Sequence, residues 1–310
     1  MASNSTKAKL LQAIFANKHV LEWAGVTECR VSPDNDADIK NLRVTREGRD
    51  QIDNFMKDSS AVLDLTAPTN SNISGLTLQM VKAKLADGTK MASFDCSYFA
   101  KRREAEKRET SKLERITHRL HKFVSKNTQY EILEVLYSFI CQVVDLLPEE
   151  DTSRMAPDDV DDLSRSRRED GWGGFTKSHK IRVFLKELGR INGKVDTWQN
   201  ALDALEALLH IAGDEWEMLV LDRRDLIDAG NRDSRHDTRV NDLTFVLGQT
   251  FPPAHRFLMT RECEEPYLSW FECRLDDESN LWQPAEHFAL CPSQEGLSEE
   301  GVLLGDMTKP

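Results

Sequence analysis

The chain of 310 residues lacks closely paired cysteines, a long hydrophobic run and an excess of positive charge. Its six cysteines are scattered without a Cys-x-x-Cys pair, so we expect free thiols in a reducing compartment. The most apolar stretch, residues 132–147, is interrupted by Glu134 and Asp145 and is too short to cross a bilayer. The sequence therefore predicts an intracellular protein, cytoplasmic or nuclear, with no membrane span.

Positive charge is scarce overall but concentrated locally. The net charge of −12 argues against a general nucleic-acid coat, because neutralising phosphates requires an excess of Lys and Arg. Residues 101–126 nevertheless contain ten Lys or Arg against four Glu, whereas residues 145–170 contain ten Asp or Glu against four Arg. These two adjoining blocks could neutralise each other within one molecule.

Hydrophobic periodicity predicts an α+β fold that is predominantly helical, with small β elements. Helical spacing covers residues 7–23, 46–57, 98–126, 129–147, 179–190, 197–212 and 214–228. Alternation typical of strands covers residues 29–31, 42–44, 245–247, 256–260 and 268–274. Ser5 and Thr128 stand where helix N-caps are expected, and Pro148 stands where a helix must end.

The segment around Asp87-Gly88 is open to two interpretations. Asp-Gly between two partly alternating runs, residues 76–85 and 91–99, is typical of a β-hairpin turn. The spacing of Leu78, Val81 and Leu85 also fits a helix over residues 73–85. We favour the hairpin.

The acidic stretch 149–178 is the best candidate for a domain boundary, because it has few apolar residues and many Asp. We predict a mixed N-terminal domain with long helices at 1–148 and a flexible linker at 149–178. Residues 179–310 are then a helical group followed by a small β element and an irregular tail. Two helical regions are thus joined by an acidic linker.

A row of cations gives the first candidate site. Its members are spaced four and three residues apart, which keeps them on one helical face. They are Arg108, Lys112, Arg115, Arg119, Lys122 and Lys126. This basic stripe could bind an acidic protein surface, bind RNA or DNA, or pair with the acidic segment at 145–170.

Trp172 is the second candidate, within Gly171-Trp172-Gly173-Gly174. This run is not a phosphate loop, because it lacks the Gly-Lys-Ser/Thr ending. Tryptophan is enriched in the residues that dominate binding energy, so we interpret Trp172 as a docking anchor. Burial against its own domain is the alternative.

Two sets of residues could bind metal. Four zinc-type ligands lie near the C-terminal end: Cys263, Cys273, His287 and Cys291. Ordinary buried thiols with a surface histidine are the favoured interpretation, so no cofactor is expected and zinc is a minority alternative. The loop from residue 225 to 242 clusters possible ligands for a divalent metal: Asp225, Asp228, Asp233, His236, Asp237 and Asp242. Arginines interleave with these acids, so internal ion pairing is favoured there.

No nucleophile elbow, zinc-protease, dinucleotide-binding or kinase signature occurs, so an enzyme is not favoured. We expect a non-catalytic interaction or regulatory protein that docks another macromolecule, in the first place a protein. The docking elements would be the basic amphipathic helix and the acidic, Trp-containing linker. The first alternative is RNA or DNA binding by the basic stripe, and the second is a metal-dependent enzyme built on residues 225–242.

Overall fold

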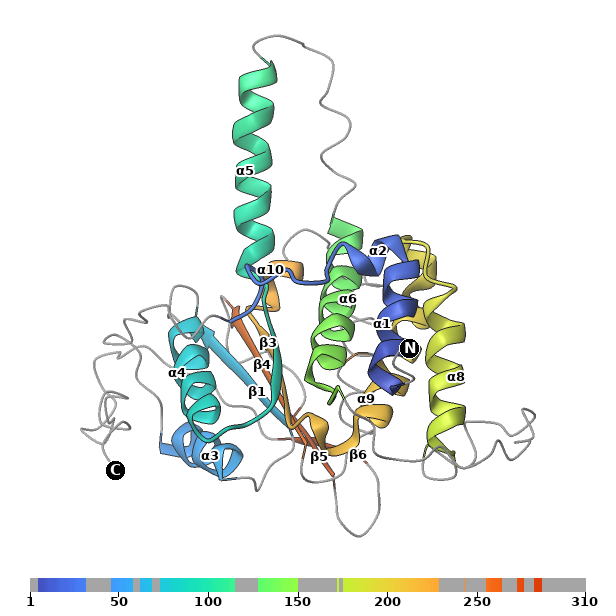
Figure 1. Cartoon of the computed structure of the whole chain (residues 1–310). Coiled ribbons are helices and arrows are strands. Elements are labelled where there is room, and N and C mark those ends of the chain that lie inside the picture. Colours follow the sequence, from blue (N-terminus) through green and yellow to red (C-terminus); the bar gives the residue numbers. More distant parts are fainter. Residues whose placement is uncertain are drawn as a thin grey trace. The chain divides into compact units, whose positions relative to one another are not determined.

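The structure is a computed structural model, and it falls into two compact units (Figure 1). The residues that it describes are 5–31, 46–57, 62–68, 73–114, 128–149, 172, 175–228, 243, 255–263, 272–275 and 282–285. The first unit comprises residues 1–26 and 129–216, and the second comprises residues 27–128 and 217–310. Each unit is thus assembled from two separate stretches of chain, a grouping that differs from the sequential division predicted at 149–178.

The first unit is helical throughout its described part. Its elements are α1 (Thr6–Ala16), α2 (Lys18–Leu21), α6 (Thr128–Leu146), α8 (Lys177–Leu188) and α9 (Trp198–Ala212), with short 3-10 turns η2 (Val195–Thr197) and η3 (Gly213–Glu215). Helix α8 packs against both α9 and α1. The core contains α6 and α9 side chains that are almost completely buried, such as Phe139 and Leu205.

Local sequence explains where these helices begin. The Ser5 hydroxyl accepts a hydrogen bond from the amide of Ala8, and the Thr176 hydroxyl accepts one from the amide of His179. Both are N-caps that satisfy an amide with no partner inside the helix. The predicted helices at 7–23, 129–147 and 197–212 are confirmed, except that Asn17 divides the first into α1 and α2.

The second unit is built on a parallel sheet. Its elements are α3 (Arg46–Met56), β1 (Val62–Pro68), α4 (Ile73–Ala86), β2 (Met91–Asp95), α5 (Ser97–Glu114), β3 (Met218–Asp222), α10 (Asp225–Asp228) and β4 (Arg256–Cys263). The strand order is β1-β4-β3-β2, and every neighbouring pair is parallel. A separate antiparallel pair joins β5 (Glu272–Leu275) to β6 (Trp282–Ala285).

One face of the parallel sheet carries an apolar cluster together with α3 and α4. Leu63 and Leu65 of β1, Leu258 of β4 and Val220 of β3 share this face and are buried with Phe55 of α3. Side chains alternate between the two faces of a strand, so Asp64 lies on the opposite face. The fold is therefore mixed and rich in helix, as predicted, but its strands form a parallel sheet rather than scattered β elements.

The hairpin predicted around Asp87-Gly88 is wrong, and the helix that was its alternative is confirmed as α4. Gly88 adopts a φ of 81° and donates its amide hydrogen to the carbonyl of Leu85, while Thr89 donates to Lys84. Asp-Gly is therefore the end of a helix, where glycine is favoured because it has no Cβ. Helix α4 is buried on several faces, which obscured its helical period.

The helix predicted at 214–228 is also wrong, because residues 218–222 form β3. All five residues of this strand are buried, so both of its faces are apolar or internally bonded. A strand buried on both faces lacks alternation and cannot be distinguished from a buried helix by period alone. Only α10, four residues long, is helical at the end of that range.

The other predicted elements have mixed outcomes. The helix at 46–57 and the strand at 256–260 are confirmed as α3 and β4, whereas residues 29–31 form no strand. Strand β1 was not predicted. The segments 42–44 and 245–247 lie outside the described residues, as does most of the acidic stretch. Within the described part of the chain, no helix has the length and apolarity needed to cross a membrane.

Candidate functional site at the carboxyl edge of the sheet

Parallel strands bring their carboxyl ends to one edge, which is where ligands bind in open sheets of this kind. In this sheet Asp95 ends β2 directly beside Asp222, which ends β3. Because Leu221 is the register partner of Met259, the next residue of β4, Thr260, lies beside Asp222 on its other side. The three side chains share the sheet face that carries α4.

Asp222 is the centre of this edge. Its carboxylate accepts hydrogen bonds from the hydroxyls of Thr260 and Thr77, the latter at 2.8 Å from the first turns of α4. Asp222 is only 2% exposed. Burial raises the pKa of Asp222 above its ordinary value, and the charge of Asp95 adds to the rise, while hydrogen bonds from Thr260, Ser74 and Thr77 oppose it.

Asp95 has its own structural role. Its carboxylate accepts hydrogen bonds from both the amide and the hydroxyl of Ser97, at the beginning of α5, and lies 4.0 Å from the ammonium group of Lys101. A carboxylate in this position stabilises a helix N-terminus. Asp95 therefore stabilises the beginning of α5.

A buried ion pair lies on the opposite face of the sheet. The guanidinium of Arg224 donates to Asp64 at 2.8 Å, and the two side chains are 8% and 5% exposed. Within the described part of the chain, the second oxygen of Asp64 and the Nε atom of Arg224 are buried without a hydrogen-bond partner. Such a pair requires both members, because removing one leaves an uncompensated buried charge.

Arg223 holds the turn that follows β3. It adopts a φ of 57°, donates its amide to the Thr260 hydroxyl, and bonds Asp225 through two nitrogens. It also lies 3.3 Å from Glu262 at the end of β4. Partial burial opposes the charge of Arg223, yet Asp225, Glu262 and Asp222 together raise its pKa above the ordinary value.

The carboxyl edge is thus a closed network. Its acids bond to hydroxyls, a helix terminus or arginines, and Arg261 in turn donates to Thr66. Among the residues that the structure describes, no group of three His, Cys, Asp or Glu could hold a metal ion. This arrangement stabilises the turns at the edge of the sheet.

Most of the predicted site residues lie outside the described side chains. Arg108 is described: it is exposed on α5 and lies 3.7 Å from Glu104 one turn earlier. Lys112 belongs to α5, but its side chain is not described. The remaining members of the basic stripe, Arg115, Arg119, Lys122 and Lys126, fall outside the described residues. The stripe stays a prediction.

The two predicted metal sets have little overlap with the described part. No side chain of Cys263, Cys273, His287 or Cys291 is described. In the Asp cluster, Asp225 is bonded to Arg223, as the interleaved arginines indicated, while the side chains of Asp228, Asp233, His236, Asp237 and Asp242 are not described. Cys29, Cys96 and Cys141 are buried free thiols.

Trp172 lies against its own unit. Its indole nitrogen donates to Glu206 of α9 at 2.7 Å, its ring stacks on His210 at 4.9 Å, and its exposed fraction is 7%. This is the alternative placement considered for Trp172. The docking role stays a prediction, and it would require the indole to leave Glu206.

Sequence reasoning missed the residues of the carboxyl edge. Asp222 was assigned to a helix, and Asp95, Thr77 and Thr260 were assigned no role. The available signal was an acidic residue directly after a short, wholly apolar run, as in Met218–Asp222. Such a run is typical of a buried parallel strand, whose last residue lies at the ligand edge of the sheet.

Comparison of the chain with protein-family models, with curated proteins and with solved structures finds no match.

Proposed function

We propose that the chain is a non-catalytic regulatory or interaction protein whose second unit has the plan of a nucleotide-phosphate-binding domain without its chemistry. Phosphate-binding loops connect a parallel strand to a helix, with the pattern Gly-x-x-x-x-Gly-Lys-Ser/Thr. Here β1 ends at Pro68 and α4 begins at Ile73, which gives the same strand, short connection and helix. The serine of the pattern corresponds by spacing to Ser74, near the start of α4.

The rest of the pattern is replaced in this chain. Aligned on Ser74, the two glycines correspond to Ala67 and Asn72, and the lysine corresponds to Ile73. In a working loop that lysine reaches the phosphates of the nucleotide. Ile73 is completely buried in the apolar cluster beneath α4, so it offers neither charge nor access. This replacement supports loss of phosphoryl chemistry.

The main support for the proposal is that Asp222 is already hydrogen-bonded to other side chains of the protein. In nucleotide-hydrolysing domains of this plan, an aspartate and the loop Ser or Thr together hold Mg²⁺. Here the carboxylate is buried, and its Oδ1 atom accepts hydrogen bonds from the hydroxyls of Thr77 and Thr260. A group used in this way stabilises the domain and keeps α4 on the sheet, which suits a scaffold better than an enzyme.

The test is nucleotide turnover by the full chain. We expect no Mg²⁺-dependent release of phosphate from ATP or GTP, and no change in that result for Asp222→Asn. Hydrolysis that Asp222→Asn abolishes would overturn the proposal, because it would make Asp222 a metal ligand in an active site.

Nucleotide binding without turnover is the second candidate, favoured by the pairing of Ser74 with Asp222. Titration of the full chain with a fluorescent ATP analogue, with and without Mg²⁺, measures it directly. Binding that requires Mg²⁺ and is lost in Ser74→Ala, but kept in the matched variant Ser93→Ala, would support it. Ser93 lies on β2 away from the carboxyl edge and bonds the amide of Val31.

The partner of such a scaffold is proposed to be a protein that contacts the basic stripe, with RNA or DNA as the alternative ligand. Reversing Arg115 and Arg119 to Glu should abolish either interaction. Binding to nucleic acid should also fall steeply as salt rises, because counterions are released from phosphates. The metal-dependent enzyme built on residues 225–242 also stays a proposal; it fails if added divalent ions change neither stability nor hydrolysis.

A further inference from the structure

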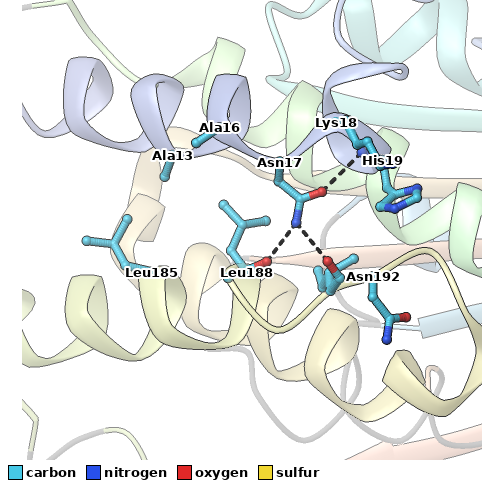
Figure 2. A pocket seen from close by; sticks show the side chains of 10 residues that line it. Ala13, Ala16, Asn17, Lys18, His19, Leu185, Leu188 and Asn192 are labelled. Atoms are coloured by element: carbon cyan, nitrogen blue, oxygen red, sulfur yellow. Dashed lines mark hydrogen bonds between the residues drawn. The ribbon is translucent and has the colours of Figure 1, made fainter.

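The first unit contains a groove between α1 and α2 on one side and α8 with its following turn on the other (Figure 2). Its volume is about 520 Å³, within the range of sites that hold side chains or small ligands. Five lining residues are apolar: Ala13, Ala16, Leu185, Leu188 and Ile191. The others are Asn17, Lys18, His19, Gly189 and Asn192, so no acidic residue lines the groove.

Asn17 fixes the walls of the groove relative to each other. Its side-chain amide donates to the carbonyls of Leu188 and Ile191 at 2.8 and 3.1 Å (Figure 2). Its oxygen caps α2 by accepting from the amides of His19 and Val20. The last turns of α1 and α8 are therefore held together by one side chain. The groove is a preformed feature of the unit.

The helices that form the groove are strongly basic, although the whole chain is acidic. Together α1, α2 and α8 contain seven Lys or Arg and a single acid, Glu187. Glu187 is 7% exposed and is bonded by Asn200, Arg190 and Lys186. Lys7 pairs with Glu149, which lies outside these helices. The three helices around the groove thus carry more cations than acids, and Lys18 and Arg182 are among these cations.

Cations flank both ends of the apolar floor. At one end Lys18 and His19 line the groove themselves. At the other, Lys9 lies four and seven residues before Ala13 and Ala16, so helical geometry places it on the same face of α1. Arg182 stands three residues before Leu185 and holds the same position on α8.

We propose that this groove binds an acidic amphipathic helix of a partner protein. A groove between two helices, with an aliphatic floor and charged ends, fits a helix that inserts apolar residues at i, i+3, i+4 and i+7. Acidic residues on the flanks of that helix would meet Lys9, Arg182 and Lys18. This inference concerns the first unit alone and is independent of the function proposed for the second.

Two other anionic ligands fit less well. Single-stranded nucleic acid is held by aromatic side chains on which bases stack, and the groove is lined by none of Phe, Tyr or Trp. A lipid surface is flat and is bound by convex apolar faces, whereas this apolar surface is the floor of a groove. Both ligands are outcomes that the following test separates.

The test selects ligands for the full chain from a displayed library of helices of about 18 residues, or five turns. Library members carry Leu at i, i+3, i+4 and i+7 and random residues elsewhere. The selection is repeated on Ala16→Trp, which fills the groove at an exposed position. We expect enriched helices to be acidic and to bind Ala16→Trp at least about tenfold more weakly.

The controls separate blocking of the groove from damage to the fold. Phe15→Ala removes a side chain that is 60% exposed on α1 but does not line the groove, so binding should be unchanged. Lys18→Glu combined with Arg182→Glu changes only surface charge and should also weaken binding at least about tenfold. Circular dichroism and melting curves verify that each variant is folded.

Four results would overturn the proposal. The selection could yield no helix, it could yield neutral or basic helices, or the selected helices could bind both groove variants as tightly as the original chain. Binding of phosphatidylserine vesicles or single-stranded oligonucleotides that Ala16→Trp abolishes, without any selected helix, would identify a different anionic ligand and would also overturn it.

Discussion

The carboxyl edge of the sheet and the groove of the helical unit have opposite characters. The edge is rich in charged and hydroxyl groups, but these groups are buried and bonded to one another, as Asp222 is to Thr77 and Thr260. The groove has an aliphatic floor, yet the helices around it carry almost only positive charge. Judged by residue type alone, the edge would be taken for a reactive site and the groove for ordinary hydrophobic packing.

The difference shows that the bonds a polar group already makes within the protein, more than its residue type, decide whether it stabilises the fold or binds a ligand. A buried acid that already accepts several hydrogen bonds gains little from a ligand, because binding would first have to break those bonds. A groove that is lined by cations and no acid can attract an acidic ligand. Four substitutions test this comparison, two at each site.

The largest effect is expected from Arg224→Met at the carboxyl edge. It leaves Asp64 charged and buried without its partner, so the free energy of unfolding should fall by about 3–5 kcal/mol. Urea denaturation measures the change. Adding Asp64→Leu to the same chain should recover most of the loss, and failure to recover it would show that the edge is not held by this pair.

The next largest effect is expected from Asn17→Ala at the groove. It removes hydrogen bonds to Leu188, Ile191, His19 and Val20, so the free energy of unfolding should fall by about 2 kcal/mol. Asn17→Asp is the matched control, because it keeps the cap on α2 and loses only the donors. An equal loss in both variants would mean that the cap contributes nothing.

A smaller effect is expected from Gly193→Ala, beside the groove. Gly193 adopts a φ of 77°, and a Cβ there would lie 2.5 Å from Nδ1 of His19. Strain and contact together should cost about 1–2 kcal/mol by thermal unfolding. His19→Ala in the same background should return only the part due to contact, and full recovery would show that the backbone is unstrained.

The smallest effect is expected from Asp222→Asn. The raised pKa means that the folded protein keeps this proton to a higher pH than the unfolded chain, so ionisation costs stability as pH rises above the ordinary value of 3.8. The amide cannot ionise and keeps one acceptor oxygen. At pH 7 the variant should be as stable as the original chain or slightly more stable.

Urea unfolding between pH 4 and pH 8 checks the sign for Asp222→Asn. Its advantage over the original chain should shrink as pH falls toward 4, because the folded original chain then holds the proton and no longer carries a buried charge at Asp222. A variant that is several kcal/mol less stable at pH 7 would contradict the interpretation of the edge, because it would show that the ionised carboxylate stabilises the fold.

The helices were largely predictable from the sequence, because caps and apolar spacing are local signals. Ser5 and Thr176 cap α1 and α8 as their residue types favour. The sheet was not predictable in the same way. Strands β1 and β3 are buried and lack alternation, and their pairing with β4 joins residues almost two hundred positions apart for β1.

The candidate sites were not predicted from the sequence for a related reason. The groove joins α1 to α8 through contacts of Asn17 with residues more than 170 positions away, so no local pattern marks it. Its basic character was divided among separate short helices, each with only a few cations. The stripe at 108–126 was recognisable because its charges recur at helical spacing within one short segment of the sequence.

The position of β4 has a consequence for synthesis of the chain. This strand is the last of the parallel sheet in sequence, yet it lies between β1 and β3. Until residues 256–263 have left the ribosome, β1 has no neighbour with which to form the parallel sheet, and the inner edge of β3 is exposed. Folding of the second unit must therefore wait until residues 256–263 have been synthesised. A nascent chain paused before that point would depend on a chaperone to keep its unpaired strands from aggregating.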